Sequence, residues 1–531
     1  MKYSAWMRRI ATLLASLTCL GGVCILPAHA AEANDAETYE AKKAAYREQI
    51  MADDVTTDDF LIGAWVSFYS FETDSFEKQL DRMAAAGMNF NTTNLNPYEH
   101  YEMSANMTEA EYWNEVERQY AAHNMVYHIR NSSVELAVEY AAGKEHCVGY
   151  HLLDEPGGDA LQWVAESVAV YREADPTRYP FVNLNPSYAG EDWLGGTYYE
   201  YVSRFVELTG AENIEYLSHD FYPFQEGVSK NNTDIFADME VIRDVAYKNG
   251  KLKTHAFPQS TAWNGMRMPN IDEMRWNVYA YLAYGFKALS WFNLVCPGAS
   301  DTEGEGFYDC LIYRDGTIRN PELFAAWSEL NWEIRGMSSI LMNLDAAHAY
   351  HVKANVDGVE KLPEDFFLQP ANRYDFVISV MEPKEGDDEY IMIFNKNSRR
   401  EAKGEFTVDP ASGVKWVEYF DPHIGEYIPM ELEDGMLKDS YLVGEGKLYR
   451  LRYDTPPSET EETEETTEPT ETTAEVPTES ATNATTEATG TAPETNGKPS
   501  ADGGCSSVVG FGATMVSAIA AAVVVYRKKE E

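Results

Sequence analysis

Short apolar segments, rich in β-branched and aromatic residues, alternate with amphipathic helical stretches between Phe60 and Gly298. This alternation is typical of repeated βα units, in which each buried strand is followed by a helix that covers it. Helices are predicted over 76–86, 160–174, 235–249 and 271–285, among others. The eight predicted strands begin near Phe60, Gly87, Met125, His146, Tyr179, Ile214, Lys251 and Lys287.

The spacing of these strands predicts a closed barrel. Successive strand starts lie about 21 to 38 residues apart, which is the length that one βα unit needs. Eight such units predict an α/β fold of the (β/α)8 or TIM-barrel type. A doubly wound open sheet would need a glycine-rich phosphate loop after its first strand, and the segment GAWVSFYSFE contains none. A long helix over 321–341 is expected to leave the barrel, and alternating stretches beyond it predict a small antiparallel β-sandwich.

The two ends of the chain have a different composition. Residues 1–30 join a positively charged start to an apolar run and an Ala-His-Ala site, which is typical of a secretory signal peptide. Residues 455–504 are rich in Thr, Glu and Pro and predict a disordered linker. Residues 505–526 carry no charge and precede a basic tail, 527–531, so they predict a transmembrane anchor with a cytoplasmic end. We therefore expect a secreted protein anchored at the extracellular face of the membrane.

These boundaries leave a helical lead-in at 31–58, a barrel domain at 59–344 and a sandwich domain at 345–454. The formal net charge of −45 argues against nucleic acid as a partner, because phosphates would be repelled. Cys147, Cys296 and Cys310 are dispersed and odd in number, so they predict no disulfide framework, and a pairing of the last two stays open. Since no metal-ligand spacing or phosphate-binding motif is visible, we expect no metal and no cofactor.

Polar and aromatic residues gather where the predicted strands end, which is where active sites lie in such barrels. Carboxylates and amides pair with sugar hydroxyls, and aromatic rings pack on the C–H faces of sugars, so this mixture favours a carbohydrate substrate. The strongest candidates are Asp154 and Glu155, which follow the apolar stretch VGYHLL and precede Pro156. The other candidates are Trp65, Asn91, His128, Arg130, Asn183, His219, Asp220, Tyr222, Gln259, Trp263, Trp291 and Asn293.

The segment GYHLLDEP resembles the strand-four motif of clan A glycoside hydrolases, in which Asn-Glu-Pro supplies the general acid/base. The resemblance implies that Glu155 is the acid/base. Two residues depart from the clan A pattern. Gln259 stands near the position of the strand-seven nucleophilic Glu, and Asp154 replaces Asn. An adjacent Asp-Glu pair is similar to families 20 and 123, the β-N-acetylhexosaminidases, where the acetamido oxygen of the substrate is the nucleophile.

That second resemblance implies that Asp154 orients the acetamido group, Glu155 protonates the leaving oxygen and Tyr222 donates to the acetamido carbonyl. Three readings follow. The first is substrate-assisted hydrolysis of a 2-acetamido-hexoside. The second is a two-carboxylate glycosidase, of the β-galactosidase or endo-glycanase kind, that uses Glu155 with Asp220. The third is a carbohydrate-binding barrel without catalysis, because a fold alone does not imply a function.

Overall fold

The computed structural model describes residues 33–69, 74–92, 106–131, 133–228, 231–296 and 306–456. The predicted signal peptide, transmembrane anchor and cytoplasmic tail lie outside these residues, and so does the predicted linker beyond Pro456. Among the helices within the described ranges, none is long and apolar enough to cross a membrane.

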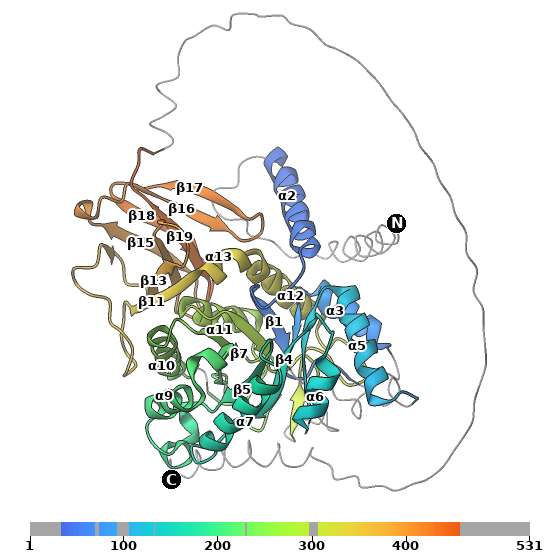
Figure 1. Ribbon diagram of the computed structural model, residues 1–531. Coiled ribbons are helices and arrows are strands. Elements are labelled where there is room, and N and C mark those ends of the chain that lie inside the picture. Colours follow the sequence, from blue (N-terminus) through green and yellow to red (C-terminus); the bar gives the residue numbers. More distant parts are fainter. Residues whose placement is uncertain are drawn as a thin grey trace, which may run out of the picture. The chain divides into compact units, whose positions relative to one another are not determined.

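Eight parallel strands form the predicted barrel (Figure 1). Their order in the sheet is β1-β9-β7-β6-β5-β4-β3-β2, so each strand lies beside its neighbour in sequence, apart from the short β8 (Ala262–Trp263), which is not in this sheet. All eight predicted strands are confirmed. They are β1 (Leu61–Ala64), β2 (Phe90–Asn91), β3 (Val126–Ile129), β4 (Cys147–Asp154), β5 (Tyr179–Leu184), β6 (Tyr216–Asp220), β7 (Lys253–Phe257) and β9 (Ala288–Trp291).

The barrel closes between β1 and β2 through Asn89. Its backbone N–H donates to Ile62 O at 3.0 Å, and its side chain adds two further bonds across the same gap. Asn89 Oδ1 accepts from Ile62 N at 2.7 Å, and Asn89 Nδ2 donates to Phe60 O at 3.1 Å. A buried amide thus satisfies backbone groups that would otherwise lack partners where the strand ladder is incomplete.

Helices surround the strands as the sequence predicts, with bounds that differ from the predicted ones by one or two residues. Capping explains several starts, because the Thr108, Thr197 and Asn270 side chains each accept from the amide three residues later, and a Glu there bonds back. The helices are α3 (Phe76–Ala85), α5 (Glu109–His123), α6 (Val134–Ala141), α7 (Leu161–Ala174), α9 (Tyr198–Thr209), α10 (Ile235–Lys248) and α11 (Ile271–Ala283).

The last predicted helix differs in two ways from the expectation. It divides after Gly336 into α12 (Pro321–Gly336) and α13 (Ser338–Asn343). Gly336 O accepts from Tyr46 Oη at 2.7 Å, and the glycine lies so close to Pro422 O that no Cβ would fit. Further, α12 stays on the barrel. Its Asn331 accepts from Trp291 Nε1 at 2.9 Å and donates to Ala86 O at 3.0 Å, so this helix covers β9.

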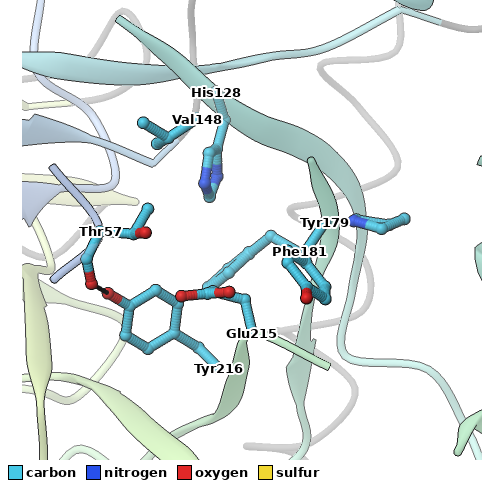
Figure 2. Close-up of a pocket in the computed structure, with 8 residues that line it drawn as sticks. Thr57, His128, Val148, Tyr179, Phe181, Glu215 and Tyr216 are labelled. Carbon is cyan, nitrogen blue, oxygen red and sulfur yellow. Dashed lines mark hydrogen bonds between the residues drawn. The ribbon is translucent and has the colours of Figure 1, made fainter. Parts of the chain in front are cut away.

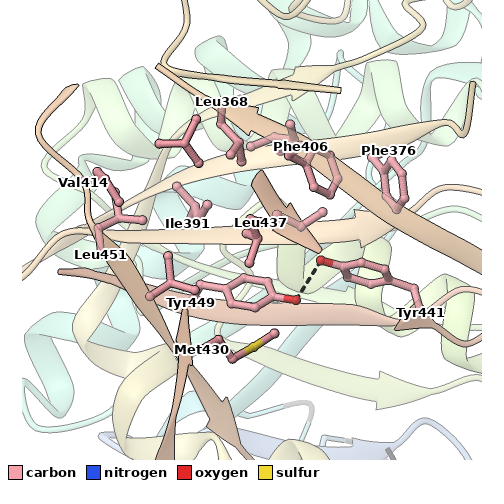
Figure 3. Close-up of a cluster of buried hydrophobic side chains, with 14 of the residues drawn as sticks. Leu368, Phe376, Ile391, Phe406, Val414, Met430, Leu437, Tyr441, Tyr449 and Leu451 are labelled. Atoms are coloured by element: carbon pink, nitrogen blue, oxygen red, sulfur yellow. Dashed lines mark hydrogen bonds between the residues drawn. The ribbon is translucent and has the colours of Figure 1, made fainter. Parts of the chain in front are cut away.

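Two antiparallel sheets form the predicted β-sandwich. Its core includes Phe376, Phe406 and Leu437, and Figure 3 shows Tyr441 and Tyr449 joined by their hydroxyls, 2.7 Å apart, within it. The larger sheet has the order β11 (Leu344–His351), β13 (Phe376–Pro383), β14 (Tyr390–Asn395), β19 (Gly446–Arg452), β16 (Trp416–Asp421) and β17 (Glu426–Glu431). The smaller one has β12 (Leu368–Pro370), β15 (Ala402–Val408) and β18 (Met436–Tyr441).

The sandwich packs on the barrel through α10 and α11. Trp276 Nε1 donates to Lys396 O at 2.8 Å, and Arg243 Nη1 donates to Ala347 O at 2.7 Å. Gly444 lies against the backbone of Trp276 at a distance that excludes a Cβ. These contacts are on helices that surround the barrel, and Trp276 also packs on Phe224 in the loop after β6, so the sandwich supports the barrel wall and this loop.

The three described cysteines are free and buried. The pairing of Cys296 with Cys310 that the sequence left open is therefore not formed. Instead, Cys310 Sγ lies 2.8 Å from Thr261 Oγ1, and a hydrogen bond with Cys296 adds to the burial that raises the pKa of the Cys310 thiol.

Candidate active site

The two adjacent acids lie at the carboxyl end of β4. Asp154 is the last strand residue and pairs in register with Asn183 on β5. Glu155 adopts a positive φ of 47° while its N–H donates to Asn183 O at 2.9 Å. A left-handed conformation is costly for a residue with a Cβ, and such conformations cluster at functional sites. Successive side chains of a strand point to opposite faces, but Glu155 leaves the extended conformation. It is therefore not forced to the face opposite Asp154.

Asp154 is held on one side and open on the other. Its Oδ1 accepts from Asn183 Nδ2 at 3.1 Å, and its side chain is partly exposed. Burial raises the pKa of Asp154 to about 6, although the Asn183 hydrogen bond and the charge of Arg130 both lower it. Arg130 is an exposed cation at the end of β3. Asp154 is therefore the acid of this site that ionises most readily.

Asp220, at the end of β6, meets Glu155. The two carboxyl groups lie close enough to affect each other's proton affinity. Burial, followed by the charges of Asp220 and Asp154, raises the pKa of Glu155 well above its usual range. Burial and the charge of Asp154 raise the pKa of Asp220 to about 8, even though Tyr222 donates a hydrogen bond to it. Since two neighbouring carboxylates cannot both ionise easily, this pair keeps at least one proton near neutral pH.

Buried aromatic rings surround the acids. The Tyr222 and Trp263 rings are perpendicular with centroids 4.8 Å apart, and Phe292 lies 4.9 Å from each of them. Trp65 packs edge-on against His151 at 5.2 Å. Trp65 and Trp263 are 6% and 2% exposed, so both serve as walls of the site and not as open platforms for a sugar ring.

Gln259 is fully buried, and the protein backbone uses its whole amide. Its Oε1 accepts from Phe224 N at 3.1 Å. Its Nε2 faces the carbonyl oxygens of Arg267 at 2.8 Å, Thr261 at 3.2 Å and Phe224 at 3.3 Å. Gln259 therefore connects the loops after β6 and β7 by hydrogen bonds. Its amide is already bound to the backbone and is not available to a substrate.

Asn91 and Asn293 are also buried beside the mouth. Ser67 Oγ donates to Asn91 Oδ1, and Val66 N donates to Asn293 Oδ1 at 3.1 Å. Both asparagines thus hold the segment after β1 in place. The Nδ2 of Asn293 has no hydrogen-bond partner among the described residues.

Three predicted site residues lie away from the acids. His219 is on the outward face of β6, where it contacts Tyr198 and Tyr281. Trp291 also faces outward, against α12. Neighbouring strand residues point to opposite faces, so His219 and Asp220 cannot share one site. His128 points into a pocket at the amino ends of the strands, with Thr57, Val148, Tyr179, Pro180, Phe181, Glu215 and Tyr216 (Figure 2).

Two aromatic residues near the acids were missed in the sequence analysis. Trp193, on the short α8 (Glu191–Leu194), is 54% exposed, and its ring lies so close to Gly157 that a Cβ there would come within 3.2 Å. Its backbone O also accepts from Gly158 N at 2.9 Å. Tyr188 is partly exposed, and burial, then the charges of Asp220 and Glu155, raise its pKa. Both follow β5 on helical turns of three or four residues, which are too short to show a periodic pattern.

No protein-family model and no curated protein sequence matches the chain. Several solved structures are similar in fold. A family 5 glycoside hydrolase from Bacteroides vulgatus has 12% identity and a TM-score of 0.45, over 74% of this chain and 89% of that one. A family 42 β-galactosidase from G. stearothermophilus has 10% identity and a TM-score of 0.46, over 75% of this chain and 100% of that one. Likenesses at this level do not establish an activity, which has to be argued from the residues of the site.

Proposed function

We propose that the protein is a glycoside hydrolase in which Glu155 is the general acid. The observation that carries the proposal is the proximity of the Glu155 and Asp220 carboxyl groups beside a third acid, Asp154. Glycoside cleavage needs a carboxyl group that still holds a proton near neutral pH. Burial and two neighbouring acids keep Glu155 in that state, at the end of the barrel where active sites of this fold lie.

The same arrangement favours substrate-assisted cleavage of a 2-acetamido-hexoside. The acetamido oxygen of the sugar would form a bond to the anomeric carbon while the glycosidic C–O bond breaks and the leaving oxygen takes the proton of Glu155. Asp154, ionised, would accept from the acetamido N–H with its second oxygen. Water would then add to the anomeric carbon while the bond from the acetamido oxygen breaks, and one proton of that water would pass to the Glu155 carboxylate. Tyr222, whose hydroxyl lies near Asp220 and the other two acids, would donate to the acetamido carbonyl.

A two-carboxylate mechanism fits the geometry less well. Retaining enzymes keep their two carboxyl groups about 5 Å apart, and inverting enzymes about 6.5 to 9.5 Å, so that a sugar carbon or a water fits between them. Glu155 and Asp220 are near neighbours, and the charge of Asp220 raises the pKa of Glu155. Gln259, at the place where a strand-seven nucleophile would be expected, is bound to backbone groups. Substrate assistance needs neither residue as a nucleophile.

Turnover of paired substrates tests the mechanism. The full-length protein is assayed on nitrophenyl N-acetylhexosaminides and on the matching 2-hydroxy glycosides. We expect turnover of the acetamido substrates alone, since the 2-hydroxy sugars lack the nucleophile. Turnover of the 2-hydroxy sugars alone would contradict substrate assistance and favour the Glu155–Asp220 pair. Sugar binding without any turnover, unchanged by Glu155→Gln, would favour a non-catalytic carbohydrate-binding barrel.

We further propose that the enzyme acts on glycans outside the cell, held there by residues 505–526. The support is the sequence alone: an uncharged run of 22 residues, the basic tail after it and the leader at 1–30. Fractionation of cells that express the full chain tests this. The protein should sediment with membranes and be removed from intact cells by an external protease, and deletion of 505–531 should release it into the medium. Recovery of the intact chain in the cytosol would contradict the proposal.

A further inference from the structure

A chain of side-chain hydrogen bonds crosses the interior of the barrel and ends on Asp154. Its members come from six different strands or strand ends, and all but Asp154 are fully buried or nearly so. We call this chain the relay. From its far end, its members are Thr92, Ser290, His255, Ser218, Asn183 and Asp154.

The contacts of the relay are short and continuous. Ser218 Oγ lies 2.9 Å from Asn183 Oδ1, and Asn183 Nδ2 lies 3.1 Å from Asp154 Oδ1. His255 joins the two halves, with Nδ1 2.9 Å from Ser218 Oγ and Nε2 2.9 Å from Ser290 Oγ. Thr92 Oγ1 then contacts Ser290 Oγ. Every link is at hydrogen-bond distance, so the six side chains form one network.

The charge of Asp154 fixes the direction of every bond in the relay. An ionised carboxylate only accepts, so Asn183 presents Nδ2 to it and Oδ1 to Ser218. Ser218 has a single hydroxyl proton, which it donates to Asn183, so it must accept from His255 Nδ1–H. His255 Nε2 then accepts from the Ser290 hydroxyl. A proton on the Asp154 oxygen that faces Asn183 would require the amide, the imidazole tautomer and the hydroxyls to reverse together.

His255 is suited to this position because it stays neutral. Burial, followed by the neighbouring His128 and His219, lowers its pKa well below the usual value. A neutral imidazole has one donor and one acceptor, which is what the link between two serines requires. The ring is packed between Phe181 at 5.1 Å and Phe257 at 4.7 Å, so it is held in place.

We propose that the relay keeps Asp154 ionised and its second oxygen free for the substrate, with Ser218 and His255 as positioning residues. The relay would thereby give the two adjacent acids different tasks, since its last side-chain bond goes to Asp154, whereas Glu155 meets it only through a backbone N–H and keeps its proton. Hydrogen bonds in a chain polarise one another, so each donor along the relay strengthens the last bond, from Asn183 to Asp154. The inference rests on the proposed function, because only there does Asp154 need an oxygen for an acetamido N–H.

The test follows the ionisation of Asp154 by NMR, which does not depend on turnover. Other groups also set this ionisation: Arg130 from β3, Glu155 beside it and Asp220 and Tyr222 after β6, and all of them stay in place in the variants. The full-length protein is labelled with aspartate carrying 13C at Cγ. The Asp154 signal is the one that disappears in Asp154→Asn. Its titration midpoint is then compared between the wild type and Ser218→Ala.

We expect Ser218→Ala to raise the Asp154 midpoint by about 0.5, because loss of polarisation weakens a charge-assisted bond by a fraction of its strength. Ser290→Ala, further along the relay, should raise it by less. Ser379→Ala is the matched control, since Ser379 is equally buried in β13 and its hydroxyl has no hydrogen-bond partner among the described residues. It should leave the midpoint unchanged.

The acidic limb of kcat/KM supplies the second readout. The pKa of this limb should rise together with the NMR midpoint in Ser218→Ala. It should return to the wild-type value in Ser218→Thr, which restores the hydroxyl. An unchanged midpoint in a folded Ser218→Ala variant would overturn the relay, whatever the activity. A shifted midpoint in a protein that turns over no acetamido sugar would keep the relay and reject the proposed function, so the two failures are distinguishable.

Discussion

Gln259→Glu would restore the carboxylate that clan A enzymes carry near this position, and the structure predicts that it will cost stability instead. The wild-type Nε2 shares its two protons among the carbonyl oxygens of Phe224, Thr261 and Arg267. A carboxylate would face these three acceptors without a proton, in a fully buried place. Two lost hydrogen bonds and a buried group without partners together amount to about 3 to 5 kcal/mol.

The loss should depend on pH. The buried site raises the pKa of the introduced carboxyl in the folded state above its unfolded value of about 4.3, so the protonated acid, which can still donate one bond, is retained at low pH. The loss of stability is therefore smallest below the unfolded pKa of about 4.3. It grows as pH rises above that value, until the carboxyl group ionises in the folded protein as well. We expect the free energy of unfolding, from urea denaturation, to fall by several kcal/mol at pH 8 and by about 1 to 2 kcal/mol less at pH 5.

Gln369→Glu is the matched control. Gln369 Nε2 also donates to two carbonyl oxygens, of Pro363 at 2.8 Å and Phe366 at 3.0 Å, but this side chain is partly exposed on the sandwich. Water can replace its partners, so the loss should stay below about 1 kcal/mol. An unchanged stability in Gln259→Glu, together with new turnover of 2-hydroxy glycosides, would refute the reasoning and identify Gln259 as a residue open to the substrate.

Three further predictions follow from the acids and from Trp193. Asp154→Asn should lower kcat/KM on an acetamido substrate by about 100-fold and abolish the acidic limb that the wild type shows near pH 6, since protonation of Asp154 causes that limb; a retained limb would contradict this assignment. Asp220→Asn should stabilise the protein by about 2 kcal/mol or more at pH 8 but not at pH 3. The pKa of Asp220 is about 8 in the folded protein and about 3.9 in the unfolded chain, so wild-type stability falls as pH rises between these two values. Equal thermal stability of both proteins at pH 8 would refute this. Trp193→Ala should raise KM about tenfold without lowering the thermal midpoint, because the exposed ring can stack on a sugar but supports little of the core; an unchanged KM would exclude Trp193 from the substrate site.

The sequence predicts the barrel well because its strands and helices are marked by local patterns. Each strand is a short apolar run, and each helix has its own amphipathic period, so neighbours in sequence become neighbours in the sheet. The course of α12 was not predictable in this way. Its end at Gly336 contacts Tyr46 and Pro422, which come from distant parts of the chain and leave no local pattern in the sequence.

The site was predicted in part. Strand ends correctly indicated Asp154, Glu155 and Asp220 as neighbours, because parallel strands bring their carboxyl ends to one edge. Position at a strand end does not show whether a side chain points into the barrel or outward, and His219 and Trp291 face the helices. The relay was missed because Ser218 and His255 lie within strands, where a serine or histidine carries no signal until its neighbours on other strands are known.

The most direct test of the central claim measures how the rate depends on the leaving group when Glu155 is replaced. A general acid helps a poor leaving group far more than a good one, and its loss costs about 100- to 10,000-fold where protonation is needed. Glu155→Gln should therefore slow the hydrolysis of a simple alkyl N-acetylhexosaminide by that factor and leave the dinitrophenyl substrate within about tenfold of the wild type. An equal loss on both substrates, or no loss on either, would contradict the assignment of Glu155 as the proton donor.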